Sequence, residues 1–499
     1  MSTRQGRGIF HWRSILAPRA AVIFLAAGFS FDACADEIPK APVPKSPFVT
    51  VVYRYADAML EHGRDTYGSQ KTGLLLSALD RTALAPLTNR PTAPAGVREE
   101  DRAGAKEAPL TGANPQHDEN LLRLLYMLSE LSGKPKYREA ADAELKWFLQ
   151  KAASPATQLL PWGAHMSWDV VKDEPIRNDD SPAGSHEFFR PWLLWDRCFE
   201  LAPDASKQCA LALWEHHLAS HATDAFDSHA VEAGNDLPRH AGFFIRTWSV
   251  AYARTKDEQF LKAIEVLLER FENKRQPKTG LIELRPPNAS IASTLSFAID
   301  CDGAAHRAPG PLASRLRAVA ARADEIFCAL PQDLKTTGGF ITEFDTTAGA
   351  RKGKPTPLWS ARDGVSTTAQ IGMMCVSRYE NTGKTGYREL IHAAADAYLK
   401  SMPGDAEDVW PGTIGHAISL QLAAWRSTAK QVYFDRARTL GDFALEKFFD
   451  QGPFPRASLK CDHYETITGA DTLALALVEL HLELLHITAV RYPPNTIDR

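Results

Sequence analysis

Apolar residues recur along this chain with the spacing of helices, and the helices come in pairs joined by short polar turns. The pattern is clearest where a turn at 382–387 leads into a run with apolar residues three or four positions apart. A similar turn at 132–137 precedes another such run, and looser copies stand at 255–260 and 428–433. In each, small or polar residues stop one helix and an aromatic follows as the next begins. The pattern predicts αα-hairpins that recur about every 50–70 residues, which is typical of a repeat architecture.

The same periodicity over the whole chain predicts about seven such hairpins. The expected helices start near residues 51, 117, 134, 186, 204, 240, 257, 290, 312, 365, 384, 413, 430 and 465. Helices that are charged along one face suit an outer layer. Helices that begin with polar residues and continue more apolar suit an inner layer, as at 186–200, 365–379 and 465–484.

Three long inserts without helical periodicity, at about 154–185, 221–239 and 331–363, each precede an inner helix. They therefore fall on one side of the repeat, where the loops of a closed ring surround a central cleft. The last helix, 467–486, is expected to pair with the first, 51–62, and close that ring. We predict an all-α fold, an (α/α) toroid of six to seven helical hairpins with short β-ribbon or loop inserts at its mouth. An open helical solenoid is the alternative.

The first 35 residues predict an export signal. Several arginines precede an apolar run from Ala20 to about Phe31, and Ala33-Cys34-Ala35 offers a cleavage site. That run is too short to span a bilayer as a helix, and no later segment is long and apolar enough. We therefore expect a periplasmic or extracellular protein. Its predicted parts are a signal peptide at 1–35, an extended leader at 36–50, one toroid catalytic domain at 51–490 and a C-terminal tail at 491–499.

Charge and composition exclude several kinds of partner and chemistry. The 57 Lys and Arg nearly balance the 61 Asp and Glu, and no basic stripe favours nucleic acid. No P-loop, dinucleotide fingerprint, G-x-S-x-G elbow or H-E-x-x-H helix stands in the context it requires. We expect no cofactor and no metal. The six cysteines after the signal lack zinc-knuckle spacing, and buried free thiols are the simpler interpretation for those in helices.

Aromatic and polar residues gather on the loop at 161–169. It carries Trp162, His165, Trp168 and Asp169. An indole stacks on the apolar face of a sugar ring while polar groups bind its hydroxyls. The loop therefore predicts carbohydrate binding, and a loop anchored by buried tryptophans is the alternative.

Charged residues stand at the expected starts of two inner helices. His186 and Arg190 are one helical turn apart, a cationic pair that suits a sugar bearing a carboxylate. Glu187 between them is either a catalytic carboxylate or a charge that favours the helix dipole. Arg239 and His240 precede the next inner helix, where a histidine suits general acid or base catalysis.

Two further stretches complete the candidate residues. Trp359 is a candidate sugar-binding residue. Asp363 stands where the helix near 365 needs an N-cap, and is either a cap or a catalytic carboxylate. His463, Tyr464 and Glu465 enter the last inner helix as a candidate acid/base group, with Glu465 also compatible with a first-turn charge.

The export signal, the T-G-K-x-x-Y turn at 382–387 and the mouths rich in Trp, His and Asp resemble six-hairpin glycosidases and related (α/α)-toroid carbohydrate enzymes. The resemblance spans about residues 50–488. It is strongest to enzymes of uronic-acid sugars, both glucuronidase-like hydrolases and toroid polysaccharide lyases. It implies an oligo- or polysaccharide substrate bound in the central cleft.

Three functions follow from these candidates. Glycoside hydrolysis, which we favour at this stage, requires two carboxyl groups, with Asp169, Glu187, Asp363 and Glu465 available. A lyase requires a base, which His240 or His463 could supply, and a cation for the uronate carboxyl, which Arg190 or Arg239 could supply. Tyr464 could then act as the acid for the leaving oxygen. A non-catalytic glycan-binding protein on the same ring is the third.

Overall fold

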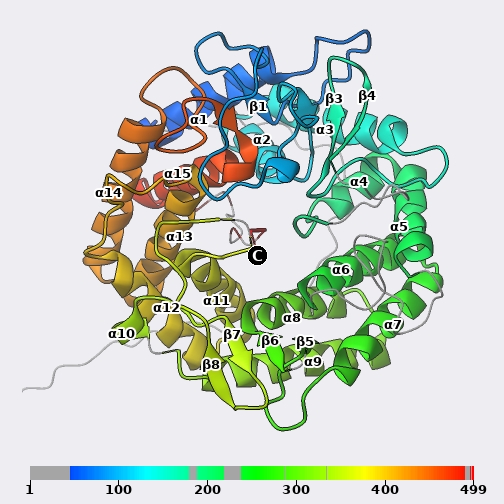
Figure 1. The fold of residues 1–499 in the computed structure, drawn as a ribbon, viewed down its shortest axis with the longest axis vertical. Coiled ribbons are helices and arrows are strands. Elements are labelled where there is room, and N and C mark those ends of the chain that lie inside the picture. Colours follow the sequence, from blue (N-terminus) through cyan, green and yellow to red (C-terminus); the bar gives the residue numbers. More distant parts are fainter. Residues whose placement is uncertain are drawn as a thin grey trace, which may run out of the picture. The chain divides into compact units, whose positions relative to one another are not determined.

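The structure is a computed structural model that describes residues 45–178, 188–218, 238–285, 287–332, 334–362, 364–488, 490, 495, 497 and 498. All of them belong to one unit, residues 42–499. Its helices form a ring of hairpins in two layers (Figure 1). The inner helices are α2 (Glu119–Ser132), α4 (Trp195–Leu201), α6 (Pro238–Thr255), α8 (Ile291–Ala305), α11 (Thr368–Thr382), α13 (Pro411–Thr428) and α15 (Ala470–Leu484). The outer helices are α1 (Pro47–Ala58), α3 (Pro135–Trp147), α5 (Pro203–His217), α7 (Gln259–Asn273), α9 (Gly310–Ala329), α12 (Thr385–Tyr398) and α14 (Gln431–Phe448).

The hairpin turns have the backbone that the repeated sequence predicts. Gly133 and Gly383 adopt left-handed conformations with φ of 68° and 67°, and each amide donates to the carbonyl four residues earlier. In the looser copies Lys256 and Ala429 take the same conformation. This geometry satisfies a free carbonyl at the end of one helix and turns the chain into the next. The turns are structural.

The tyrosine that follows three of these turns fastens one outer helix to its neighbour. Tyr137 of α3 donates to Asp57 of α1 at 2.7 Å, and Tyr433 of α14 donates to Asp396 of α12 at 2.7 Å. Tyr387 of α12 donates to Asp324 of α9, also at 2.7 Å. Asp324 is buried and forms an ion pair with Arg378 at 2.8 Å. The repeated aromatic therefore links the hairpins around the ring.

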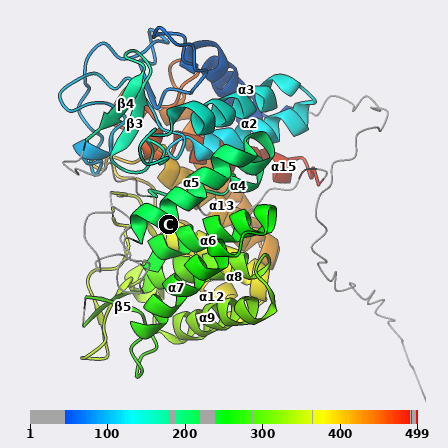
Figure 2. The same ribbon diagram turned by 90° about the vertical axis from the view of Figure 1, so that its right-hand side faces the viewer.

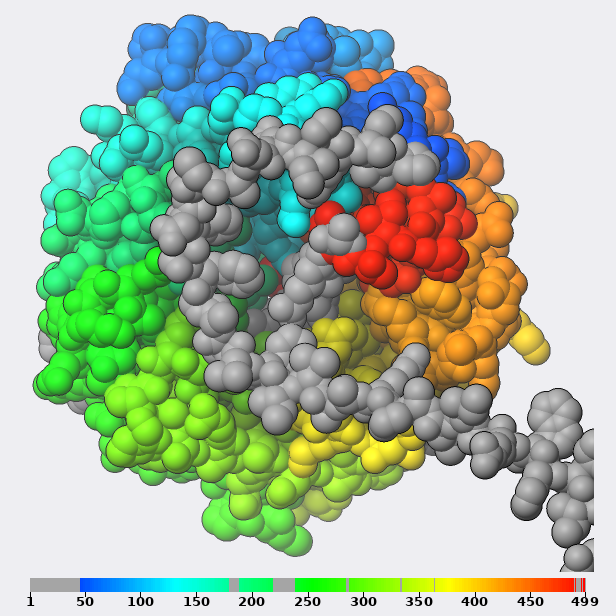
Figure 3. Space-filling view, turned by 180° about the vertical axis from the view of Figure 1, so that it is seen from behind, coloured from blue at the N-terminus to red at the C-terminus, as the bar shows by residue number. Residues whose placement is uncertain are grey.

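The ring closes where its last helix meets its first. α15 packs against α1 as its hairpin partner and against α2 and α13 on either side. Ser46, before α1, forms a hydrogen bond with His481 of α15 at 2.9 Å. From behind, the blue beginning and the red end of the described chain lie side by side (Figure 3). The predicted all-α toroid is confirmed, and the part of the chain that the structure describes contains seven hairpins.

Short strands and loops cover one face of the ring (Figure 2). One sheet orders β2 (Gly112–Ala113), β3 (Met166–Asp169) and β4 (Glu174–Arg177); another orders β5 (Glu283–Arg285), β6 (Asn288–Ser290), β7 (Glu343–Asp345) and β8 (Ala350–Lys352). A third pairs β1 (Ala78–Leu79) with β9 (Tyr464–Glu465). The remaining elements are α10 (Leu334–Thr337), π turns at Met59–Gly63 and Phe148–Ala152, and 3-10 turns at Glu99–Asp101 and Thr466–Thr468. The β inserts therefore stand at the mouth.

Three predicted helix starts are wrong. Residues 188–194 are not helical and α4 begins only at Trp195, because Pro191 removes a backbone donor and restricts the residue before it. Thr367, in a capping box, is the N-cap of α11, so the cap expected at Asp363 stands elsewhere. Glu465 belongs to β9 instead of a first helical turn, since α15 begins after Gly469, whose φ is 81°.

Other expectations concern thiols and membranes. The six cysteines from Cys198 to Cys461 are free thiols, four of them buried. Among the described residues, no helix combines the length and the apolar character that crossing a bilayer requires.

Candidate active site

A cavity of about 120 Å³ lies where the N-terminal ends of several inner helices converge. Its wall combines residues 97–101 with the chain entering α4, the start of α6, the stretch before α11 and the starts of α13 and α15. The cavity continues into a wider groove of about 1010 Å³ along β6, β7 and β8. Arg239, Ala361 and Arg362 line both. Together they form one open path from the mouth toward the centre of the ring.

The wall of the inner cavity is strongly cationic. Four arginines line it, namely Arg98, Arg190, Arg239 and Arg362. Among its described lining residues only two carboxylates face them, Asp101 and Asp498. Both carboxylates are in ion pairs. The arrangement suits a ligand that carries negative charge.

Asp101 is held by Arg98 and His165. Arg98 donates to it through two nitrogens at 2.7 and 3.0 Å, and His165 Nδ1 lies 3.1 Å from its Oδ1. Burial alone would raise the pKa of Asp101, but the hydrogen bonds from His165 and Arg98 outweigh it and keep that pKa below its usual value. Asp101 therefore stays ionised, and His165 stands just behind the cavity wall.

Arg190 is fixed from several sides in the irregular chain before α4. Its Nη1 donates to the carbonyl of His117 at 3.2 Å and its guanidinium lies 5.2 Å from the ring of Phe189. The Phe189 amide in turn donates to Gln116 at 2.8 Å. Burial lowers the pKa of His117 to about 3, so its ring, packed on Phe189, stays neutral. The chain before α2 thus positions an arginine that is 5% exposed and faces the cavity.

Arg239 and His240 open α6 beside the same cavity. Arg239 lines the cavity, and its Nε donates to His240 Nε2 at 3.2 Å. His240 is buried and lies next to Phe243. The hydrogen bond requires a lone pair on Nε2, so this nitrogen is a proton acceptor in the structure. The cavity wall thus carries an arginine that is directly backed by a histidine.

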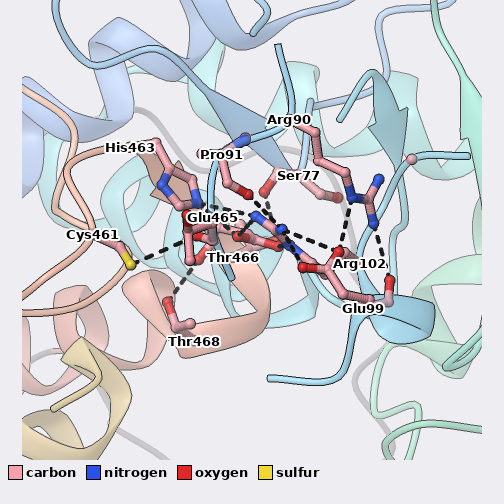
Figure 4. A network of polar contacts seen from close by, with 12 residues as sticks. Ser77, Arg90, Pro91, Glu99, Arg102, Cys461, His463, Glu465, Thr466 and Thr468 are labelled. Carbon is pink, nitrogen blue, oxygen red and sulfur yellow. Dashed lines mark hydrogen bonds and ion pairs between the residues drawn. The ribbon is translucent and has the colours of Figure 1, made fainter. Parts of the chain in front are cut away.

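His463 and Glu465 come together, but in a buried network away from the cavity wall (Figure 4). Glu465 lies between the guanidinium of Arg102, at 2.9 Å through both nitrogens, and His463 Nε2 at 2.7 Å. Burial would raise the pKa of Glu465, but the bonds from His463 and Arg102 lower it to about 2. The Tyr464 hydroxyl is fully buried and bonds the Tyr55 hydroxyl at 2.8 Å. The network joins residues 99–102 to the turn before α15.

The aromatic loop is anchored inside the fold. Trp162 is 2% exposed within a cluster of rings from Phe148, Phe188, Trp192 and Trp195. Trp168, in strand β3, packs edge-on against Trp147 at the end of α3. Asp169 accepts amide hydrogen bonds at 2.9 and 3.1 Å across the turn to β4. Trp359 is also buried and donates to Ser401. In this arrangement these four side chains stabilise loops, while the sugar-binding role predicted for them stays a prediction.

The remaining predictions concern three candidate residues and the absence of a metal. His186, Glu187 and Asp363 lie outside the described residues. Among the described residues, no three His, Cys, Asp or Glu side chains are grouped as metal ligands.

The cavity contains residues that the sequence analysis missed. They are Arg98, Asp101, Arg362, His416 and Asp498. Arg98 and Asp101 come from the long helix-poor stretch before residue 115, whose length was itself a sign of a functional loop. His416 lies in the middle of a continuously buried helix, and no local pattern distinguishes it from a packed core residue.

Comparisons with known proteins found a family model and several solved structures that are similar to this chain. Residues 103–232 match the family model described as periplasmic pectate lyase. A solved structure of D-mannose isomerase is similar at 9% identity and a TM-score of 0.47, over 88% of this chain and all of that one. The GH76A α-1,6-mannanase from Salegentibacter sp. HEL1_6 gives 10% identity and a TM-score of 0.44, over 88% of this chain and 99% of that one. An unsaturated glucuronyl hydrolase specific for heparin is similar at 16% identity and a TM-score of 0.39, over 59% of this chain and 84% of that one. The family and each of these three structures are named for carbohydrate chemistry.

Proposed function

We propose that this protein cleaves uronate-containing polysaccharides by β-elimination in the central cavity of its toroid. The observation that carries the proposal is the cavity wall, where four arginines face two carboxylates that are already in ion pairs. A uronate polymer brings one carboxylate per sugar, so it matches this charge. The family model described as periplasmic pectate lyase covers the stretch that carries His165 and Arg190, and pectate is such a polymer.

Elimination requires three kinds of group in the site: a base, cations that bind the carboxylate, and a proton donor for the leaving oxygen. A base removes the proton from the carbon next to the carboxyl group, and the electron pair of that C–H bond forms the C4–C5 double bond. The bond from C4 to the glycosidic oxygen then breaks, and that oxygen leaves with the electron pair and gains a proton. Cations around the carboxylate stabilise the negative charge that develops during proton removal.

The described residues offer groups for two of these requirements. Arg190 and Arg239 are the arginines we assign to the carboxylate. His240 is the base we assign, because its Nε2 holds a lone pair toward Arg239. A base at this place would accept the proton from the carbon next to the carboxylate that Arg239 binds.

Hydrolysis, which the sequence favoured, is the second candidate. It requires two carboxyl groups that flank the scissile bond. Asp169 caps a β turn, and Glu465 is held by Arg102 and His463 with a pKa near 2. Of the four carboxylates predicted for hydrolysis, Glu187 and Asp363 therefore remain. Because the described cavity is richer in arginine than in carboxylate, we place elimination first.

The proposal includes export. A polysaccharide substrate is met outside the cytoplasm, and residues 1–35 carry the pattern of a signal peptide. The matched family model is described as periplasmic. We therefore place the action of the protein in the periplasm or outside the cell.

The deciding experiment incubates the protein with polygalacturonate, alginate and heparan sulfate. Near-ultraviolet absorbance and release of reducing ends are followed in parallel. Elimination produces an unsaturated uronate, so absorbance should rise together with new ends. New reducing ends without a rise in absorbance would show hydrolysis. If neither signal changes with any of the three substrates, the glycan-binding alternative would remain.

Variants then assign the base. His240→Gln should lower kcat by about 100-fold or more, the usual effect of losing a general base. The matched control is His463→Gln, which changes the other candidate histidine but lies in the network behind the wall. We expect His463→Gln to stay within about tenfold of the wild type. The reverse ranking would reassign the base to His463.

A further inference from the structure

The last described residues of the chain, up to Asp498, lie inside the ring. Figure 1 marks the C-terminal end near the centre, and Asn495 and Ile497 are 1% and 0% exposed. Asn495 accepts a hydrogen bond from Asn120 of α2 at 3.0 Å. Asp498 follows at the cavity wall. We call Asn495, Ile497 and Asp498 the end segment.

Three side chains from different elements bind the carboxylate of Asp498. Arg190 Nη2 lies 3.0 Å from Oδ1, and His416 Nε2 of α13 lies 3.1 Å from Oδ2. Thr472 of α15 donates its hydroxyl to Oδ2 at 3.0 Å. One guanidinium, one imidazole and one hydroxyl therefore surround a single carboxylate, and we call these three residues the carboxylate seat.

The seat is built independently of the carboxylate that fills it. Arg190 is oriented by the His117 carbonyl and by Phe189. His416 and Thr472 are 2% and 0% exposed on two inner helices that pack against each other. Burial lowers the pKa of His416 although Asp498 raises it. A neutral ring that donates through Nε2 explains the 3.1 Å contact.

The seat opens on the cavity that also contains Arg98, Arg239 and Arg362. Asp498 is 11% exposed at this wall, so its carboxylate is at the boundary between protein and cavity. Without it, the described lining residues would set one carboxylate against four arginines. An unpaired buried cation is costly, and a carboxylate from any source would relieve that cost.

We propose that Arg190, His416 and Thr472 form a subsite for the carboxylate of a uronate residue, and that Asp498 fills this subsite until substrate displaces it. The proposal deepens and rests on the proposed uronate activity. A side-chain carboxylate and a uronate carboxylate present the same two oxygens to the three donors. The end segment then competes with substrate, because only the fraction of molecules with an empty seat can bind.

Binding of single sugars tests the subsite apart from catalysis. D-Galacturonate and D-glucuronate have no glycosidic bond to break, and D-galactose lacks the carboxylate. Their Kd values are measured with the full protein by calorimetry. We expect Asp498→Ala to tighten the binding of at least one uronate by about fivefold or more, since the competing occupant is lost. Galactose binding should not change.

Two further variants identify the seat. Arg190→Ala combined with Asp498→Ala should abolish the gain, because the main donor is missing. Asp498→Asn keeps the shape of the side chain and removes its charge, so it should give a smaller gain in the same direction. Glu139→Ala removes an exposed carboxylate from the outer helix α3 and is the matched control for a general change in charge, with unchanged uronate binding expected.

The outcomes separate this proposal from the proposed function. Tighter uronate binding by a folded Asp498→Ala variant supports the subsite even if no polysaccharide is cleaved. Unchanged uronate binding, within about twofold, would overturn it even if the protein proves to be a lyase. A lower melting temperature of Asp498→Ala with unchanged binding would show that Asp498 is a structural anchor. Circular dichroism confirms that each variant is folded.

Discussion

Two arginine–carboxylate pairs lie near the mouth of this ring, and they differ in where their carboxylates come from. Glu465 is part of β9 and is paired in register with Ala78, so the backbone holds it against Arg102. Asp498 reaches Arg190 from the end segment, at the wall of the cavity. The Arg102 and Glu465 side chains are 0% and 2% exposed, and those of Arg190 and Asp498 are 5% and 11% exposed.

Because of this difference in exposure, the same kind of ion pair can serve two different purposes. Removing one member of a sealed pair leaves a buried charge that water does not reach. At a cavity wall, water or a ligand can replace the missing partner. The pair at Glu465 therefore suits a structural link, and the pair at Asp498 suits a binding site.

Breaking the buried pair of Arg102 and Glu465 should have the largest effect on stability. Arg102→Ala leaves Glu465 and Glu99 without their shared arginine, and we expect a loss of roughly 3–5 kcal/mol in the free energy of unfolding. Urea unfolding measures it. Arg254→Ala, which removes a surface pair with Asp196 at 36% exposure, should cost less than about 1 kcal/mol. Equal losses from the two variants would contradict the structural role of Arg102.

The pH dependence of stability should follow Glu465. Its pKa in the folded protein is about 2, below the ordinary 4.5. The stabilisation is therefore complete above pH 4.5 and is lost as the pH falls toward 2, a change of roughly 3 kcal/mol. Urea unfolding of wild type and Glu465→Gln at about pH 5.5 and about pH 3 should show a narrowing gap. A gap that stays constant with pH would mean that Glu465 is not ionised in the folded protein.

The smallest effect on stability is expected at the cavity wall. Asp498→Asn should lower the free energy of unfolding by about 1.5 kcal/mol, the lower end of the range for a hydrogen bond to a charged group. Arg190 keeps its bond to the His117 carbonyl and gains access to water. Thermal unfolding at neutral pH checks it. A loss as large as that of Arg102→Ala would place both pairs in the same structural class.

Much of the fold was predictable because it depends on local patterns. The period of apolar residues marks helices, and the turns at Gly133 and Gly383 need only a residue that tolerates a left-handed backbone. The predicted pairing of the last helix with the first is also found, as the contact of α15 with α1. The helix predicted to start near 186 begins only at Trp195, because Pro191 cannot donate a backbone hydrogen bond and disfavours a helical residue before it.

The site was less predictable because its residues come from distant parts of the chain. Arg190 and Arg239 were identified from their place before inner helices, and both line the cavity. His463 and Glu465 stand in the same kind of place, but the bidentate contact with Arg102 holds them in a network. No sequence pattern relates Arg102 to Glu465, because the two residues are 363 positions apart.

The sequence alone thus determined the helical hairpins, their turns and the side of the ring on which the loops gather, since these depend on neighbours within a few residues. The tertiary structure decided which charged groups meet. Asp498 illustrates this most plainly: in the sequence it belongs to an unremarked tail, and in the fold it lies against Arg190, His416 and Thr472. Such contacts between distant residues depend on how the whole ring closes, because only closure brings α13, α15 and the chain before α4 around one cavity.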